Sequence, residues 1–206
     1  MKTLINGRWT DRKEEKQSND GSFKRKDTEF RNWITPDGSP GETGVGGFKA
    51  ESDRYHLYVS LACPWAHRTL IFRKLKNLEP HIGVSIVHPI MLENGWEFRT
   101  DFSQCTGDQI LGKNSIFEVY LAADKNITSR ASVPVLWDVK QATIVSNESS
   151  EIIRMFNSAF EQISVNELDL YPRTLRTEID ELNAMIYDDV NNGVYKTGFA
   201  TSQKSY

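Results

Sequence analysis

The clearest alternation of apolar and polar positions lies between residues 54 and 90. Apolar, β-prone residues at 55–60 and 82–87 predict two strands. Between them, the stretch 65–76 carries Leu70, Ile71 and Leu75 at helical spacing. A helix between two short strands is typical of a βαβ unit, in which the two strands run parallel.

The pattern continues with four more elements before residue 157. It predicts a helix over 115–123, strands over 132–138 and 142–145, and a helix from 149 to about 156. Pro134 cannot donate to a strand ladder, so we expect its strand to lie at an edge or to carry an unusual peptide bond. With a cysteine opening the first helix and a proline opening the third strand, the order β-α-β-α-β-β-α predicts an α/β, thioredoxin-like fold.

The two ends of the chain follow a different pattern. Residues 1–50 are polar and turn-rich, and their Gly44–Gly47 stretch lacks the spacing of a phosphate loop. After residue 172, apolar residues repeat three or four positions apart and predict an amphipathic helix that ends at 191–193. The apolar positions of this helix are Leu175, Ile179, Leu182, Ile186 and Val190. We expect four regions: a loop-rich extension (1–50), a thioredoxin-like domain (51–157), a linker (158–171) and a helical segment (172–206).

Composition narrows the class of protein. The net charge of −3 gives no case for a nucleic-acid or membrane-surface partner. Two cysteines do not make a disulfide framework, and no apolar run approaches the roughly 18 residues of a membrane span. The first 16 residues contain no apolar core of a secretory signal. These features favour a soluble, cytoplasmic protein.

Cys63 is the residue with the clearest chemical potential. It comes directly before Pro64, which suits the first position of a helix. A thiol there meets unpaired N–H groups and the positive end of the helix dipole, which favour the nucleophilic thiolate, although a small buried apolar role is the alternative. His67 and Arg68 are candidates to hold that thiolate. Cys63 and His67 alone are too few ligands for a metal, so none is expected.

Five stretches carry a family resemblance. SLACPWAHRTL, MLENGW, VPVLWD, IVSNESSEIIRMFN and IDELNAMIYDDVNNGVYKTGFATSQ resemble the bacterial glutathionyl-hydroquinone reductases, the Xi class of glutathione transferases. The resemblance runs from residue 1 to residue 206, but family members are longer. It implies a thioredoxin-like, glutathione-binding domain, followed here by only the first part of an all-helical domain. It also implies homodimers that use glutathione as co-substrate and a glutathionyl-quinol as substrate.

The resemblance also implies two catalytic residues. Cys63 matches the family nucleophile, which attacks the sulfur of the glutathionyl thioether and forms a mixed disulfide that a second glutathione resolves. This monothiol scheme suits a site where Trp65 and Ala66, with no second cysteine, follow Cys63-Pro64. Tyr195 matches the family acid/base. A free phenol has a pKa of about 10, so a base near neutral pH needs neighbours that lower it.

The binding residues come from the same resemblance. The positions that match the family's glutathione site are Trp96, Arg130, Ala131, Ser132, Val133, Glu148 and Ser149. The Val133–Pro134 bond matches the cis peptide bond of thioredoxin-like folds. The residues themselves leave alternatives open: core packing for Trp96, and plain helix capping by Ser146 or Asn147 near Glu148 and Ser149.

Two other functions remain open at this point. One is an Omega-type activity on dehydroascorbate or mixed disulfides. The Cys-Pro-Trp-Ala motif and the long loop of residues 1–50 argue against it and for the hydroquinone class. The other is a non-catalytic, glutathione-binding fragment without the aromatic pocket for the hydroquinone. It would leave the apolar face of 172–190 exposed and prone to association.

Overall fold

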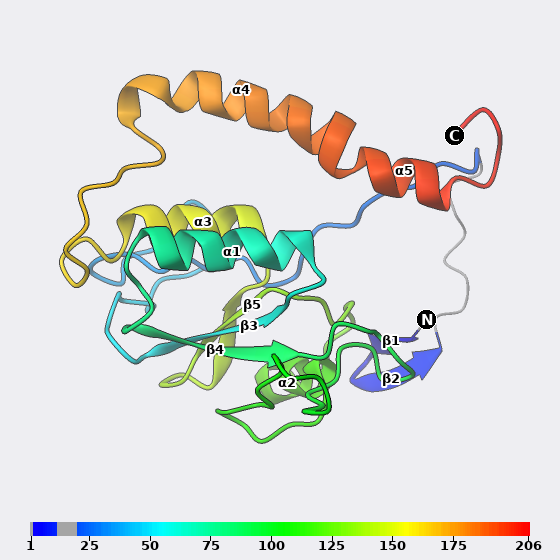
Figure 1. The fold of residues 1–206 in the computed structure, drawn as a ribbon, viewed down its shortest axis with the longest axis horizontal. Helices are drawn as coiled ribbons and strands as arrows, with labels where there is room; N and C mark the ends of the chain where they lie inside the picture. Colours follow the sequence, from blue (N-terminus) through cyan, green and yellow to red (C-terminus); the bar gives the residue numbers. More distant parts are fainter. Residues whose placement is uncertain (1, 12–19) are drawn as a thin grey trace. The chain divides into compact units, whose positions relative to one another are not determined.

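The central sheet has four strands in the order β4-β3-β5-β6 (Figure 1). The structure is a computed structural model and describes residues 2–11 and 20–206. β3 (Tyr55–Ser60) pairs in parallel with β4 (Ile82–Val87) and antiparallel with β5 (Val135–Asp138). β5 pairs antiparallel with β6 (Thr143–Ser146). The predicted parallel pair is therefore present and forms one side of a mixed sheet.

Helices cover both faces of this sheet. α1 (Pro64–Leu75) and α3 (Ser149–Ser158) lie side by side on one face, and α2 (Ile116–Ala123) lies on the other (Figure 1). Every residue of β3 and β5 is consequently buried. A strand covered on both faces needs apolar residues at most positions, which explains the near-continuous apolar runs in the sequence. The predicted order β-α-β-α-β-β-α is confirmed.

The strand that follows Pro134 is internal. β5 lies between β3 and β6, so the edge position is not the alternative that applies to this strand. The strand begins at Val135 rather than at residue 132, which keeps the proline outside the hydrogen-bonded ladder. The Val133–Pro134 peptide bond is cis. The unusual bond, and not an edge position, is the alternative that the structure contains.

A hairpin near the N-terminus was not predicted within the loop-rich extension of residues 1–50. β1 (Lys2–Ile5) and β2 (Arg8–Asp11) pair antiparallel around Asn6 and Gly7. These two residues have φ of 47° and 73°, and positive φ at both central positions defines the type I′ turn. Asn-Gly between β-prone residues is the sequence signal for such a hairpin.

The C-terminal segment is helical beyond the predicted end. A 3₁₀ turn (Arg173–Leu175) leads into α4 (Arg176–Ile186), then a π-helical turn (Tyr187–Asn191) and α5 (Gly193–Phe199). The predicted stop at 191–193 coincides with the end of the π-helical turn at Asn191, and the separate helix α5 after it was not predicted. Asn192 caps both elements: its N–H donates to the Tyr187 carbonyl (2.9 Å), and its own carbonyl accepts from Lys196 N (2.7 Å).

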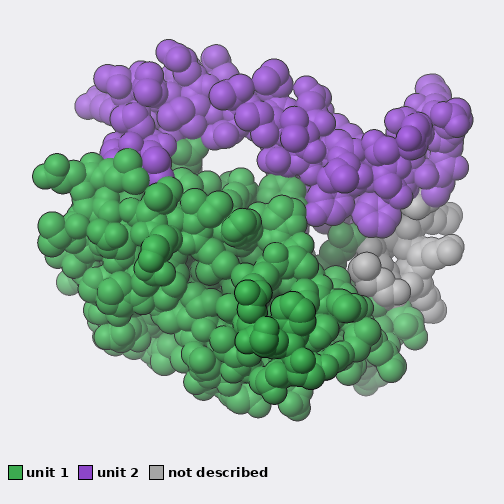
Figure 2. All heavy atoms as spheres, in the orientation of Figure 1, with its two compact units in different colours: residues 1–11, 28–168 green, residues 12–27, 169–206 purple. Residues whose placement is uncertain are grey.

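The described residues divide into two compact units, shown in different colours in Figure 2. Residues 2–11 and 28–168 form the first, and residues 20–27 and 169–206 form the second. The expected linker is divided between them. Its first part belongs with the sheet because Ser164 Oγ donates to the Lys76 carbonyl (2.6 Å) and Asn166 Nδ2 to the Leu75 carbonyl (2.7 Å), at the C-terminal end of α1. No helix in the described residues is long and apolar enough to span a membrane.

Candidate active site

Cys63 lies at the junction of β3 and α1. It is the N-cap residue of the helix, and Pro64 occupies the first helical position. The Cys63 N–H donates to the Ser60 carbonyl (3.1 Å), and its own carbonyl accepts the first helical bond, from His67 N (2.9 Å). The side chain is partly exposed. The thiol thus stands at the helix end whose N–H groups lack intrahelical partners, as the spacing predicted.

The thiol faces the segment before β5. Cys63 Sγ donates to the Val133 carbonyl oxygen at 3.5 Å. Val133 is buried, Ala131 and Ser132 are half-buried, and Arg130 is exposed. The fold therefore brings together the predicted nucleophile and the predicted backbone-binding segment, which are far apart in the sequence.

The N-terminus of α3 carries the other two predicted binding residues. Glu148 is its N-cap: Glu148 Oε1 accepts from Ser150 N (3.1 Å) and from Ser150 Oγ (2.8 Å). Ser146 Oγ instead accepts from the N–H of Glu148 (3.1 Å). The alternative of helix capping by Ser146 or Asn147 is therefore wrong about which residue caps α3, because Glu148 itself is the N-cap. A carboxylate and a hydroxyl at this end of a helix suit a ligand with an ammonium and a carboxylate group.

Arg68 connects α1 to this helix end. Its Nε and Nη2 donate to Ser149 Oγ at 3.0 and 2.7 Å, and Nη2 lies 3.8 Å from Glu148 Oε1. The guanidinium carbon also lies 5.1 Å from the centre of the Trp65 ring. From the sequence, Arg68 was a candidate only to hold the thiolate. Its contacts with Ser149 and Glu148 depend on how α1 packs against α3, and no local signal predicts them.

Trp96 lies in the loop between β4 and α2. Its carbonyl accepts from Ile116 N (2.9 Å) at the start of α2, and its ring is half-buried against the core. The preceding loop is supported by the hairpin, because Lys2 Nζ donates to Glu93 Oε1 (2.9 Å). The ring therefore packs against the core, as the alternative proposed, and also keeps an exposed part that a ligand could contact.

Tyr195 belongs to the second compact unit. The guanidinium carbon of Arg25 lies 4.5 Å from its ring centre, and Arg25 Nε donates to Asn192 Oδ1 (2.6 Å). Phe23 and Phe199 stack on the same ring, with centroid distances of 5.9 and 6.3 Å. An aromatic cluster and a cation therefore surround this phenol.

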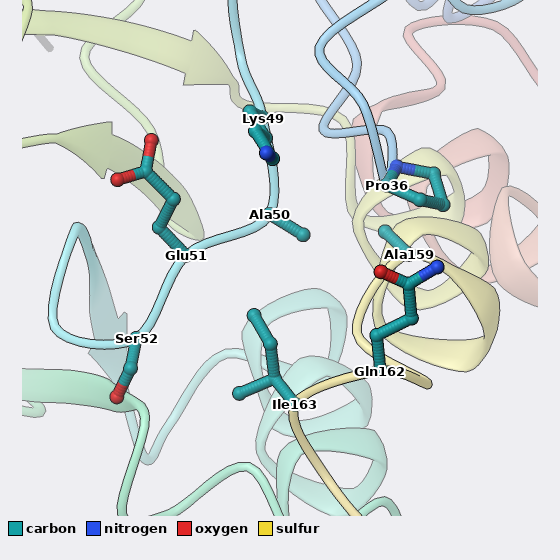
Figure 3. A pocket seen from close by; sticks show the side chains of 8 residues that line it. All are labelled: Pro36, Lys49, Ala50, Glu51, Ser52, Ala159, Gln162 and Ile163. Carbon is teal, nitrogen blue, oxygen red and sulfur yellow. The ribbon is translucent and has the colours of Figure 1, made fainter.

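Two further features of the described residues were compared with the predicted site: groups of possible metal ligands, and a hollow in the surface. Within residues 2–11 and 20–206, no three His, Cys, Asp or Glu side chains are grouped to hold a metal ion. A hollow of about 430 Å³ lies between the segment before β3 and the chain after α3. Figure 3 shows the side chains that line it. Its lining residues are Pro36, Lys49, Ala50, Glu51, Ser52, Ala159, Gln162 and Ile163. None of the predicted site residues is among them.

Known proteins resemble this chain over its full length. The family model for the glutathione S-transferase N-terminal domain matches residues 62–159. The glutathionyl-hydroquinone reductase YqjG of Escherichia coli is 60% identical over 206 residues, which are 100% of this chain and 63% of the relative. The glutathione-bound structure of YqjG matches with a TM-score of 0.88 and 57% identity, over 99% of this chain and 60% of that one.

A second solved structure carries the class name. The Xi-class glutathione transferase from Natrialba magadii matches with a TM-score of 0.90 and 45% identity, over 100% of this chain and 61% of that one. This chain belongs to the Xi class of glutathione transferases. The Xi-class chain described here spans about 60% of the length of these relatives. The family assignment and the thioredoxin-like fold agree with the sequence resemblance.

Proposed function

We propose that this Xi-class chain takes part in the glutathione-dependent reduction of glutathionyl-hydroquinones. The observation that carries the proposal is the position of Cys63 Sγ, at the start of α1 and 3.5 Å from the Val133 carbonyl. The N-terminus of α3 presents Glu148 and Ser149, which Arg68 ties to the same helix as the thiol. The relatives named glutathionyl-hydroquinone reductases support this substrate class.

The first step is attack of the Cys63 thiolate on the sulfur of the glutathionyl thioether. A Cys63–glutathione disulfide forms while the bond from sulfur to the aromatic ring breaks. The ring carbon keeps the electron pair of that bond and takes up a proton, which gives the free hydroquinone. We assign Tyr195 to proton transfer at the ring oxygen during this step, since a phenol can donate or accept a proton within hydrogen-bond reach.

The second step restores the enzyme. A second glutathione thiolate attacks the glutathione sulfur of the mixed disulfide, so that glutathione disulfide leaves and Cys63 returns as the thiolate. The two steps together consume one glutathionyl-hydroquinone and one glutathione, and they release one hydroquinone and one glutathione disulfide. A reducing cytoplasm would keep Cys63 available between turnovers.

Glutathione would be held by seven residues in the proposed scheme. Trp96 packs on it, the backbone of Arg130, Ala131, Ser132 and Val133 pairs with its backbone, and Glu148 and Ser149 hold its γ-glutamyl end. Glu148 supplies a charge opposite to the ligand ammonium, and the helix end favours the carboxylate. A homodimer is part of the same proposal, and sedimentation equilibrium tests it.

The deciding experiment is turnover of a glutathionyl-hydroquinone by wild type, Cys63→Ser and Cys105→Ser. We expect Cys63→Ser to lose turnover and wild type to be trapped as a Cys63–glutathione adduct that mass spectrometry locates. Cys105→Ser is the matched control, because burial raises the pKa of that thiol and makes it a poor nucleophile. Full activity of Cys63→Ser would overturn the proposal.

The same assay separates the alternatives. An Omega-type enzyme would turn over dehydroascorbate or a mixed disulfide faster than the glutathionyl-hydroquinone. A glutathione-binding fragment would bind glutathione in calorimetry but release no hydroquinone. Comparing this chain with one extended to the full length of its relatives tests that second alternative directly.

A further inference from the structure

Tyr120 is a buried residue with a fully used hydroxyl group. It lies on α2 and has 0% of its surface exposed. Its hydroxyl donates to the Ser132 carbonyl (3.1 Å) and accepts from Ser132 N (3.3 Å) and from Asn147 Nδ2 (2.8 Å). The Ser132 hydroxyl also lies 3.2 Å from the Tyr120 hydroxyl. A phenol has one proton to donate and two lone pairs to accept with, so the contacts with Ser132 and Asn147 use its whole capacity.

These partners belong to two different parts of the proposed site. Ser132 directly precedes Val133, whose carbonyl accepts from the Cys63 thiol. Asn147 directly precedes Glu148, the N-cap of α3. One hydroxyl thus joins the segment that would pair with the glutathione backbone to the helix end that would hold the γ-glutamyl group.

The surroundings of Tyr120 hold this arrangement in place. Asn147 Oδ1 accepts from Phe30 N (3.2 Å), and the N–H of Asn147 donates to the Phe30 carbonyl (3.2 Å). The Phe30 ring meets the Tyr120 ring edge-on at 5.9 Å. Burial raises the pKa of Tyr120, so the hydroxyl keeps the proton that it donates to Ser132.

We propose that Tyr120 is a positioning residue for glutathione, which fixes the spacing between the Ser132–Val133 segment and the Glu148–Ser149 helix end. A tripeptide that must contact both segments binds well only if their spacing already matches its length, since moving them on binding costs free energy. The inference rests on the proposed function, because it takes these two segments as the glutathione site. In this proposal Tyr120 acts through its bonds to Ser132 and Asn147.

The test compares two tyrosine-to-phenylalanine variants by calorimetric titration with glutathione under reducing conditions. Tyr120→Phe removes the shared hydroxyl and little else. Tyr58→Phe is the matched control: Tyr58 is equally buried, but its hydroxyl donates to Asp108 (3.0 Å), outside the proposed site. We expect the Kd for glutathione to rise about five- to tenfold in Tyr120→Phe and less than about twofold in Tyr58→Phe. The larger rise is within the free-energy cost of leaving buried polar groups without a hydrogen bond.

Steady-state kinetics provide a second measurement, and a loss of stability alone would not change the KM for glutathione selectively. For Tyr120→Phe we expect the KM for glutathione to rise while kcat at saturating glutathione stays within about twofold of wild type. If Tyr120→Phe does not fold, Asn147→Ala breaks the other side of the same link and is expected to raise the Kd in the same way.

The outcomes distinguish this inference from the proposed function. If wild type itself fails to bind glutathione, the proposed function fails. If wild type binds and the folded Tyr120 or Asn147 variant binds as tightly as Tyr58→Phe, the positioning role is overturned.

Discussion

The guanidinium of Arg68 and the hydroxyl of Ser149 are joined by two hydrogen bonds, of 3.0 and 2.7 Å. Arg68 lies on α1, one turn after the cysteine, and Ser149 begins α3. The planar fork of arginine can approach one oxygen through two N–H groups, which a lysine cannot do. The contact therefore couples the helix that presents the thiol to the helix end that would hold the γ-glutamyl group.

Arg68→Met should weaken glutathione binding more than Arg68→Lys does. We expect Arg68→Met to raise the KM for glutathione roughly tenfold, because a charge-assisted contact of about 1.5–3 kcal/mol is lost, and Arg68→Lys to have a smaller effect. Lys74→Met is the control on the same helix, since Lys74 pairs with the exposed Glu79. Equal KM values for Arg68→Met and Lys74→Met would contradict a role in binding.

His56 makes the stability of the fold depend on pH. Burial lowers the pKa of His56 to about 4, and its Nε2 lies 2.8 Å from Ser85 Oγ. Because the folded pKa lies below the ordinary value of about 6.5, the neutral ring stabilises the fold above pH 6.5, and this contribution is lost as the pH falls from 6.5 toward 4.

The expected loss in free energy of unfolding across that interval is about 2–3 kcal/mol. Urea unfolding at pH 7, 6, 5 and 4 measures it. His56→Gln cannot titrate and should give a flatter profile, after an initial loss at pH 7. His81→Gln, at a partly exposed histidine, is the control and should keep the wild-type slope.

The ion pair between Arg54 and Asp138 is a buried structural element. Arg54 Nη2 lies 2.6 Å from Asp138 Oδ2, and the two side chains are 6% and 0% exposed. Asp138 Oδ1 also accepts from Lys140 N (2.8 Å) in the turn between β5 and β6. Arg54 Nη1 also donates to Glu51 Oε1 (2.7 Å), but the Glu51 side chain is 31% exposed, so removing the Asp138 charge leaves the buried guanidinium with a weaker, partly solvated partner.

Asp138→Asn should therefore lower the free energy of unfolding by about 3–5 kcal/mol in urea. Asp101→Asn is the matched control, because the pair of Asp101 with Arg99 is largely exposed and such pairs contribute at most about 1 kcal/mol. Similar losses in the two variants would show that burial of the Arg54 pair does not matter.

Gly7 tests how the N-terminal hairpin is attached. Its N–H donates to the Ile127 carbonyl (2.9 Å), and a Cβ at this position would lie 1.9 Å from the Lys125 carbonyl oxygen. Gly7→Ala should lower the melting temperature by several degrees, on the order of 2–8 °C for a loss of about 1–2 kcal/mol. Calorimetry measures it.

Gly112→Ala separates the clash from the conformation of the residue. Gly112 has φ of +64° but no atom within 4 Å of a Cβ built there. Both variants carry the strain of a positive φ, and only Gly7→Ala carries the clash. Equal losses would mean that contact with residues 125–127 adds nothing to the stability of the hairpin.

Predictions from the sequence succeeded where the pattern is local. The strands at 55–60 and 82–87 match the structure residue for residue, since each apolar run is bounded by polar turns. The helix after Cys63 starts where Pro64 allows it to start. The hairpin of residues 2–11 was not predicted, and each of its strands has only four residues, which leaves little room for a recognisable alternation.

The sequence by itself determined the order of the elements, the cysteine at a helix start and the family, because apolar periodicity and short motifs are properties of neighbouring residues. Only the tertiary structure decided that Cys63 meets Val133, that Arg68 holds Ser149 and that Tyr120 joins Ser132 to Asn147. These pairs come from elements that are separated in the chain and meet only when the helices pack on the sheet. No spacing along the sequence encodes that packing.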